Sequence, residues 1–405
     1  MFGMDSKYTR LKYACYSSNI TMSVVGNLSP LLFITFHKLY DISYSLLGLL
    51  ILINFCTQLS VDLIFSFFSH KFNIPKVVTF APLLSFIGLI IFALFPFFFP
   101  QYTYIGLVIG TLLFSSASGF NEVLISPVIA AIPSPNPERE MSKLHSIYAW
   151  GVVFVVVFST LFLHIFGSKS WHFLALVFAL IPLIALILYL GTSIPQLKTP
   201  EKVSGVVKLM KNKSLWLCFM MIFFGGAAEV TMAQWSSSFL EQALNIPKVW
   251  GDIFGVALFS LTLGLGRTMY SKFGKNITRI LLFGMIGAAI CYFTVAISNI
   301  PIIGVIACTL TGFCVSMLWP GCLIVADNEL PTGGVFMYAL MAAGGDLGAS
   351  IAPQLIGIVT DAVKIHFSSD QLGLKLGMFI GTLFPLVAIP LYAYMHKQYT
   401  KARKK

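Results

Sequence analysis

Long apolar stretches alternate with short polar segments over almost the whole sequence. The stretches at 171–190 and 280–297 carry hardly any charge over about 20 residues, the length at which an α-helix crosses the hydrocarbon core of a bilayer. Such runs are much longer than the ~10-residue alternating segments of a membrane β-barrel. The sequence therefore predicts an all-α integral membrane protein. Twelve membrane-spanning helices are predicted, at 13–36, 44–69, 77–98, 104–132, 144–167, 171–193, 215–242, 250–272, 279–297, 301–327, 333–361 and 376–396.

The longest polar segment separates these helices into two groups of six. It covers residues 194–214 and contains two prolines and five lysines. We predict an N-terminal six-helix bundle at 1–196, a cytoplasmic linker at 197–214 and a C-terminal six-helix bundle at 215–405.

A short repeat relates the two halves. In the fourth predicted helix Gly119 is followed eight residues later by Pro127, and in the tenth Gly312 is followed at the same distance by Pro320. Because the two pairs occupy equivalent helices, they indicate two pseudo-symmetric bundles related by an axis along the membrane normal.

The basic residues predict the orientation. With the N-terminus inside, 20 of the 26 Lys and Arg residues fall in cytoplasmic segments and five in outer loops. Lys and Arg near helix ends are retained in the cytoplasm, so we predict a multi-pass protein of the cytoplasmic (inner) membrane with both termini cytoplasmic. The net charge of +11 follows from loops that face an anionic leaflet and requires no nucleic-acid partner.

Composition and motifs argue against a soluble enzyme. The chain is 57% hydrophobic and only 10% charged, whereas soluble domains carry about 25% charged residues. The phosphate-binding pattern GxxxxGK[ST], the zinc pattern HExxH and cysteine pairs at metal-ligand spacing are absent from the sequence. We therefore expect no catalysis, no cofactor and no metal, and transport could not be driven by ATP hydrolysis on this chain.

Four stretches of the sequence have a recognisable pattern: 121–127, 144–151, 319–320, and 343–348 together with Pro353. They resemble the glutamate-containing fourth helix and the polar fifth, tenth and eleventh helices of the fucose permease-like group of the major facilitator superfamily. The basic loop that this superfamily has between helices two and three is reduced to 69–72, and its second copy, at 264–275, is fuller. The resemblance implies a secondary active transporter that moves a sugar with protons by alternating access.

Glu122 is the predicted proton-coupling residue. It lies near the middle of the fourth predicted helix, and an ionisable group inside a span is costly and by default a functional candidate. The resemblance also places the group's proton-linked glutamate here, while a structural hydrogen bond is the alternative. The group's first-helix aspartate has no counterpart, since 24–30 contains no carboxylate. A single protonation site and an uncoupled facilitator both remain open.

Several polar residues at middle depth are candidates for binding a solute. A sugar presents hydroxyls around apolar C–H faces, so its pocket combines hydrogen-bonding groups with aromatic rings. Glu229 could instead lock the two halves, Trp235 could be packing, and His145 could be a structural partner. The predicted binding residues are Asn27, Asn121, His145, Tyr148, Glu229, Gln234 and Trp235.

Three further charged residues are predicted to act in gating. Asp62 and Arg267 lie toward the inner ends of the second and eighth helices, and a buried Arg requires an ionic partner. We expect that partner to be Asp327 or Glu329. Asp346 lies in a glycine-rich part of the eleventh helix, as a gate or as a structural residue.

Three functions compete at this stage. The first is a transporter for a small polar solute, a sugar, coupled to protons. The others are an exporter of drug-like or lipid-like compounds and a non-transporting membrane sensor. The short tails argue against a sensor, and the polar mid-depth residues argue against an apolar substrate. We expect a monomer in the lipid bilayer, whereas the identity of the solute, the direction of transport and the coupling ion stay open.

Overall fold

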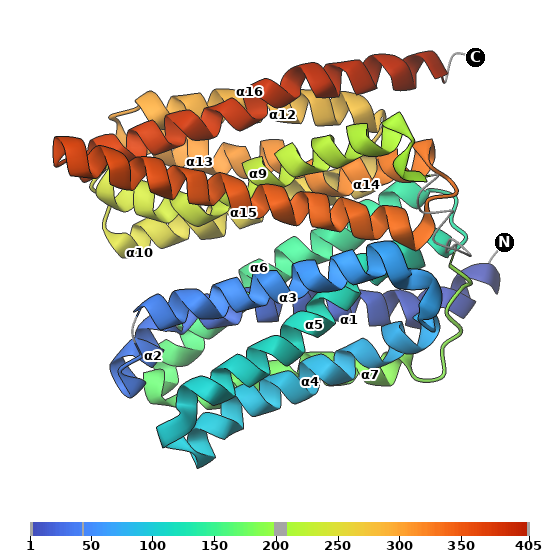
Figure 1. Ribbon diagram of the computed structural model, residues 1–405, viewed down its shortest axis with the longest axis horizontal. Helices are drawn as coiled ribbons and strands as arrows, with labels where there is room; N and C mark the ends of the chain where they lie inside the picture. Colours follow the sequence, from blue (N-terminus) through green and yellow to red (C-terminus); the bar gives the residue numbers. More distant parts are fainter. Residues whose placement is uncertain (1–2, 43, 198–208, 403–405) are drawn as a thin grey trace. The chain divides into compact units, whose positions relative to one another are not determined.

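The computed structural model describes residues 3–42, 44–197 and 209–402. Over these residues the chain is helical and contains no strand (Figure 1). The first of two compact units contains residues 1–140, 147–206 and 332–340, and the second contains 141–146, 207–331 and 341–405. Most of the predicted linker, residues 198–208, lies outside the described residues. The predicted bundle boundaries stay a prediction.

In the first unit, α4 packs against α5 and α7, α3 packs against α5, and α1 packs against α7. Phe36, Phe92 and Trp171 form an edge-to-face cluster that joins three helices, with the centroid of the Trp171 ring 4.9 Å from that of Phe36 and 5.9 Å from that of Phe92. The helices are α1 (Gly3–Leu31), α2 (Phe33–Tyr40), α3 (Tyr44–Phe68), α4 (Ile74–Phe98), α5 (Thr103–Ala131), α6 (Pro137–Phe166) and α7 (Trp171–Tyr189).

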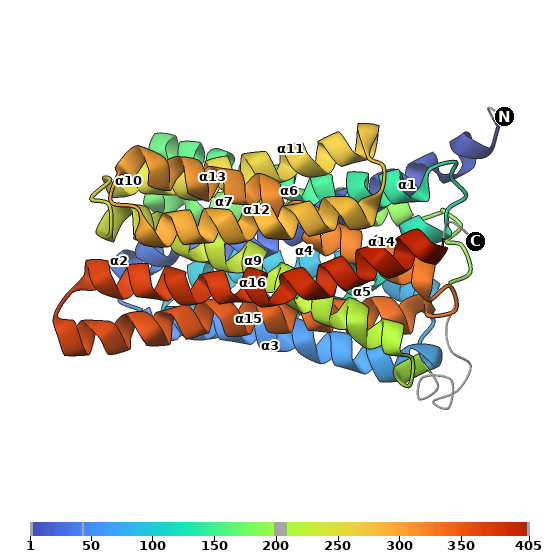
Figure 2. The same ribbon diagram turned by 90° about the horizontal axis from the view of Figure 1, so that it is seen from above.

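In the second unit, α12 lies beside α16 in both views (Figures 1 and 2) and also packs against α13. The helix α9 contacts α13, α14 and α16, and α11 contacts α13. A π-helical turn, η4, precedes α11. The elements are α9 (Lys213–Gln242), α10 (Lys248–Gly251), η4 (Asp252–Ala257), α11 (Leu258–Phe273), α12 (Ile277–Ile297), α13 (Pro301–Val315), α14 (Leu318–Glu329), α15 (Gly334–Phe367) and α16 (Asp370–Ala402).

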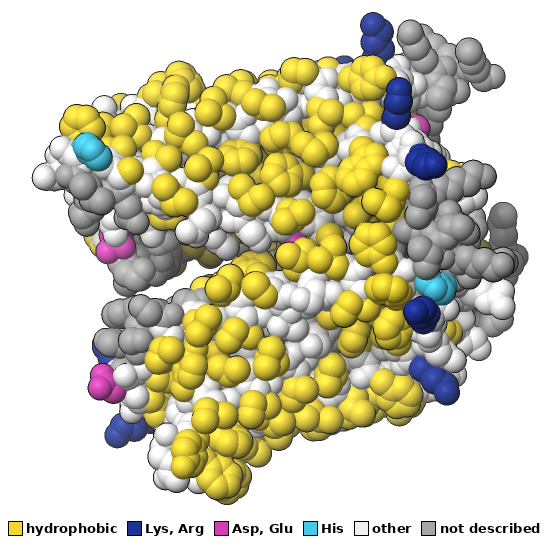
Figure 3. Space-filling view, in the orientation of Figure 1, with side chains coloured by type: hydrophobic (Ala, Val, Ile, Leu, Met, Phe, Trp, Pro, Cys, Tyr) yellow, Lys and Arg dark blue, Asp and Glu magenta, His cyan; other side chains and the backbone are white. Residues whose placement is uncertain are grey.

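The predicted all-α fold with twelve spans is confirmed. Among the described residues, ten helices are long and apolar enough to cross a membrane, and Leu49–Phe65 of α3 is a shorter apolar stretch. Apolar side chains cover the visible faces of the helices, and Lys and Arg gather near the helix ends (Figure 3). The protein is thus a multi-pass membrane protein.

Two predicted spans are broken, and a proline accounts for one of the breaks. The first span is divided between α1 and α2 at Leu32, and the tenth is divided between α13 and α14 at residues 316–317. Because proline has no N–H, Pro320 cannot donate to the carbonyl of Ser316, the residue four positions earlier. The Ser316 carbonyl is therefore available to a side chain.

The two glycines of the repeat have equivalent roles. A Cβ on Gly119 would lie 2.9 Å from the Cβ of Val61, so the glycine lets α5 approach α3 closely. A Cβ on Gly312 would collide with the carbonyl oxygen of Phe259 and with Thr262, so this glycine lets α13 approach α11. Helix pairs in membranes use small residues in this way.

Candidate functional site

The helix α5 carries the predicted proton-coupling residue. Glu122 is half-buried on this helix, five turns from its start. The neighbouring Asn121 is only 2% exposed, and its Nδ2 atom has no hydrogen-bond partner among the described residues. Pro127 leaves the carbonyl of Val123 without its helical donor. An amide donor, a carboxyl group and a backbone acceptor therefore follow one another along α5, at residues 121–123.

Two predicted binding residues meet at the contact between α1 and α6. Ser23 on α1 donates through Oγ to the carbonyl of Tyr148, at 2.8 Å, and Asn27 donates through Nδ2 to the carbonyl of Ser23, also at 2.8 Å. Gly151 makes room for Ser23, because a Cβ at residue 151 would lie 2.6 Å from the Ser23 Oγ atom. The side chains of Asn27 and Tyr148 are both half-buried, and α1 also packs against α5.

The sequence analysis missed a polar ladder between α3 and α5. Gln58 donates through Nε2 to Oδ1 of Asn54, at 3.0 Å. Ser115 donates to the same oxygen, and Ser118 donates to Oε1 of Gln58, at 3.2 Å. The polar residues recur at helical spacing on both helices, which is the signal that could have identified the ladder.

Arg267 on α11 is the centre of a buried polar network in the second unit. Its Nη2 atom donates to both carboxylate oxygens of Glu229 on α9, at 2.7 and 2.9 Å. Its Nε atom donates to the Ser316 carbonyl at 2.8 Å, and its Nη1 atom donates to the His145 carbonyl at 3.2 Å. The side chains of Arg267 and Glu229 are only 3% and 13% exposed, so the ion pair is shielded from solvent.

The expected partners of Arg267, Asp327 and Glu329, were wrong. Both lie toward the end of α14, whereas Arg267 faces α9 and the break between α13 and α14. Gly266 permits this approach, because a side chain there would collide with Ser316. Depth along a helix could be predicted from the sequence, but the identity of the facing helix could not.

The other predicted binding residues on α9 differ in their surroundings. Gln234 is exposed, whereas Trp235 is half-buried. The Nε1 atom of Trp235 donates to the carbonyl of Pro353 on α15, at 3.1 Å, which leaves only the ring face for a solute. Glu229 already accepts two hydrogen bonds from Arg267. The side chains of Glu229 and Trp235 are thus hydrogen-bonded to other residues of the protein, whereas the side chain of Gln234 is exposed.

The two aspartates predicted to act in gating are buried in different units. Asp62 lies on α3 of the first unit and is fully buried. Asp346 lies on α15 of the second unit and is buried as well. It precedes Gly348, where a Cβ would collide with the Phe223 carbonyl of α9. Gly344 and Gly348 therefore let α15 pack closely on α9, whereas Gly345 makes room for Trp319 of α14.

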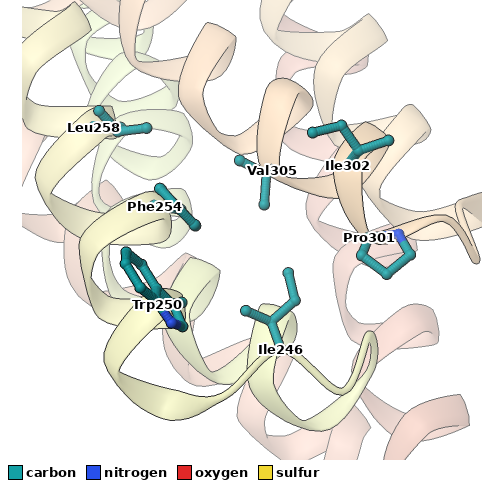
Figure 4. A pocket seen from close by; sticks show the side chains of 7 residues that line it. All are labelled: Ile246, Trp250, Phe254, Leu258, Pro301, Ile302 and Val305. Carbon is teal, nitrogen blue, oxygen red and sulfur yellow. The ribbon is translucent and has the colours of Figure 1, made fainter.

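An apolar cavity of about 520 Å³ lies apart from the predicted site residues, between α10, η4, α11 and α13 (Figure 4). All the side chains that line it are apolar or aromatic, so it has few groups that could bind sugar hydroxyls. It is lined by Ile246, Trp250, Phe254, Leu258, Pro301, Ile302 and Val305.

Solved structures of membrane transporters are similar to this chain. The Major Facilitator Superfamily transporter FucP in the outward conformation gives a TM-score of 0.77 at 14% identity, covering 96% of this chain and 99% of that chain. A variant of the Escherichia coli fucose:proton symporter FucP gives 0.71 at 15% identity, covering 94% and 99%. The proton:xylose symporter XylE bound to 6-bromo-6-deoxy-D-glucose gives 0.74 at 12% identity, covering 95% and 96%. At these identities the likeness shows the fold alone.

The family follows from the sequence as well as from the fold. A search among curated proteins finds no match. Residues 14–353 match the family model of the Major Facilitator Superfamily. Because this match covers most of the chain and agrees with the helical architecture, the protein belongs to the Major Facilitator Superfamily of membrane transporters.

Proposed function

We propose that this transporter moves a small polar solute, a sugar, together with protons, by secondary active transport with alternating access. The observation that carries the proposal is the α5 site, where the half-buried Glu122 follows the buried Asn121, whose Nδ2 atom has no hydrogen-bond partner in the part of the chain that the structure describes. A protonatable carboxyl group inside a membrane span suits proton coupling. An unpartnered amide donor suits a ligand that brings hydroxyl oxygens.

The structural neighbours support the same proposal. Two of them are a fucose:proton symporter and a proton:xylose symporter. Within the first unit, Asn27, Asn121 and Tyr148 would be the groups that bind the solute hydroxyls. Within the second unit, the exposed side chain of Gln234 and the ring face of Trp235 would be the groups that a sugar could contact.

Proton coupling would rest on one carboxyl group of the first unit. The stretch 24–30 of α1 carries no acid, so Glu122 would have to serve alone. Its protonated and ionised forms would then favour different conformations or different solute affinities, because coupling is a free-energy link between two binding events.

Uptake by proteoliposomes tests this proposal. A panel of radiolabelled hexoses, pentoses and polyols would be offered with and without an inward proton gradient. We expect one sugar class to accumulate only with the gradient. Glu122→Gln keeps the shape of the protonated side chain, so it should abolish accumulation but retain downhill exchange. Glu241→Gln on α9 is the matched control and should behave as wild type.

Two results would contradict the proposal. If the Glu122→Gln variant still accumulates sugar along the proton gradient at the wild-type level, Glu122 is not the proton-coupling residue. If no sugar is taken up and apolar dyes are actively exported, the protein is an exporter and not a sugar symporter.

A further inference from the structure

Two helical segments that both pack on the end of α9 enclose the apolar cavity of Figure 4. Gly255 of η4 lies on α9, because a Cβ there would be 2.9 Å from the backbone nitrogen of Ser237. Gly304 of α13 lies on the turn after α9, because a Cβ there would collide with Leu244. Both segments are thus held from behind, and a groove remains between their other faces. Ile246, from the same turn, lies between the two walls at one end (Figure 4).

This space, which we call the α13 groove, has apolar walls. They are formed by Trp250, Phe254 and Leu258 on one side and by Pro301, Ile302 and Val305 on the other. The rings of Trp250 and Phe254 are stacked, with their centroids 5.3 Å apart. Of the wall side chains, that of Trp250 alone has a polar atom, whereas a buried water requires two to four polar partners. The groove, at about 520 Å³, therefore suits an apolar ligand and neither water nor a sugar.

The surface next to the α13 groove is apolar as well. Ile302 belongs to one wall and also begins an exposed row along α13, since Ile302, Ile306 and Leu310 are 62%, 50% and 49% exposed and lie four residues apart. In a membrane protein such a row contacts lipid chains, which are as apolar as leucine. Trp250 is 51% exposed, and tryptophan is enriched at the level of the lipid headgroups. An acyl chain on this row would reach the groove without crossing a polar surface.

A cation lies at the start of α13, beside the α13 groove. Lys375 on α16 donates through Nζ to Oδ1 of Asn299, which is two residues before Pro301 of the groove wall. An ammonium group has three hydrogens, so Lys375 can bind Asn299 and an anionic group together. The apolar walls and this charge complement the two parts of a phospholipid, its acyl chain and its phosphate.

We propose that the α13 groove binds one acyl chain of an anionic phospholipid whose headgroup is bound by Lys375. A chain gains little by leaving a bilayer that is as apolar as the groove, so the headgroup charge selects the lipid. In the predicted orientation the start of α13 is at the outer surface, and the lipid belongs to the outer leaflet. The groove and Lys375 lie in the second unit, so this site does not depend on the proposed function of the α5 site.

Photolabelling of the full chain in nanodiscs tests the lipid site. The nanodiscs would contain phosphatidylcholine with a small share of a probe lipid that carries a diazirine in its acyl chain, either a phosphatidylglycerol or a phosphatidylcholine. Peptide mass spectrometry would compare the labelling of 246–258 and 301–305 with that of Phe283 and Ile290, which are 58% and 62% exposed on α12 and report ordinary lipid contact.

We expect the phosphatidylglycerol probe to label the groove more strongly than α12, and more strongly than the phosphatidylcholine probe does by about fivefold, the factor for roughly 1 kcal/mol per basic residue near an anionic lipid. Lys375→Gln should abolish this difference between the probes. Lys397→Gln, the same change toward the other end of α16, should retain it.

Filling the groove provides a second test. Val305 is half-buried in the groove wall, so Val305→Phe should lower groove labelling to the level of α12. Ile306→Phe, at the next and exposed position, should leave the labelling unchanged. Unchanged labelling of Phe283 and Ile290 would show that each variant remains folded.

Two results would overturn the proposal. The groove is not a lipid site if the phosphatidylglycerol probe labels it no more strongly than it labels α12. The headgroup assignment is wrong if both probes label the wild-type groove equally, or if Lys375→Gln retains the difference between them. Since no solute is used, failure of the sugar assay and failure of the lipid site are separate results.

Discussion

Removing both members of the buried ion pair should cost less stability than the two single substitutions together. Glu229→Gln leaves a guanidinium group that is only 3% exposed in the intact pair, and breaking a buried pair on one side costs about 3–5 kcal/mol. Arg267→Met leaves the carboxylate buried and also removes the donors to Ser316 and His145, so we expect a similar cost of about 3–5 kcal/mol.

The double variant carries neither charge. Its remaining defect is two backbone carbonyls without their side-chain donor, which costs about 1–3 kcal/mol for each buried group left unsatisfied. At the centres of these ranges the two single costs add to about 8 kcal/mol and the double variant costs about 4 kcal/mol. The expected coupling energy is therefore about 4 kcal/mol, at or above the upper end of the values found for residues in direct contact.

Equilibrium denaturation in mixed detergent micelles, followed in both directions, would give the four unfolding free energies. Reversibility has to be demonstrated, because many large proteins unfold irreversibly. The reasoning is wrong if the single costs add to the double cost within about 0.5 kcal/mol, the margin for independent sites. It is also wrong if either single substitution is neutral.

Three further predictions concern packing. Trp171→Ala should lower the unfolding free energy by about 3–5 kcal/mol, because the ring joins α2, α4 and α7. In the same denaturation assay, Trp216→Ala should lower it much less, because Trp216 is 41% exposed. Gly312→Ala should destabilise by about 1–3 kcal/mol through overpacking, while Gly26→Ala, whose Cβ would meet only the Tyr148 hydroxyl at 3.9 Å, should not. Pro320→Ala gives the Ser316 carbonyl a helical donor, so Arg267→Met should cost less in that background. Equal costs of Arg267→Met with and without Pro320 would contradict the role given to this carbonyl.

The positions of the helices could be predicted from the sequence because burial in lipid depends on composition averaged over about 20 residues. The irregularities inside the helices were harder to predict from the sequence. The π-turn Asp252–Ala257 leaves no trace in hydropathy. The break at 316–317 is indicated by Pro320, but proline can also be tolerated within a continuous span, as Pro127 is in α5.

The candidate site could be predicted only in part. Glu229 and Arg267 were identified as unusual because each is a charge within an apolar helix. Their pairing was not foreseen, because it depends on which helices face each other, and that is set by close contacts such as the one at Gly266. The bond from Trp235 to Pro353 joins residues far apart in the chain and could not be seen in the local pattern.

The repeated glycine and proline connect these observations. In each unit the glycine brings two helices together, and the proline eight residues later frees a carbonyl four positions before it. In the second unit that carbonyl belongs to Ser316 and is bound by Arg267. In the first unit it belongs to Val123, the residue next to Glu122. The freed carbonyl is a hydrogen-bond acceptor, and in the second unit it stabilises the cation of Arg267. A carboxyl group such as that of Glu122 could bond to such a carbonyl only when it is protonated, because an ionised carboxylate has no hydrogen to donate.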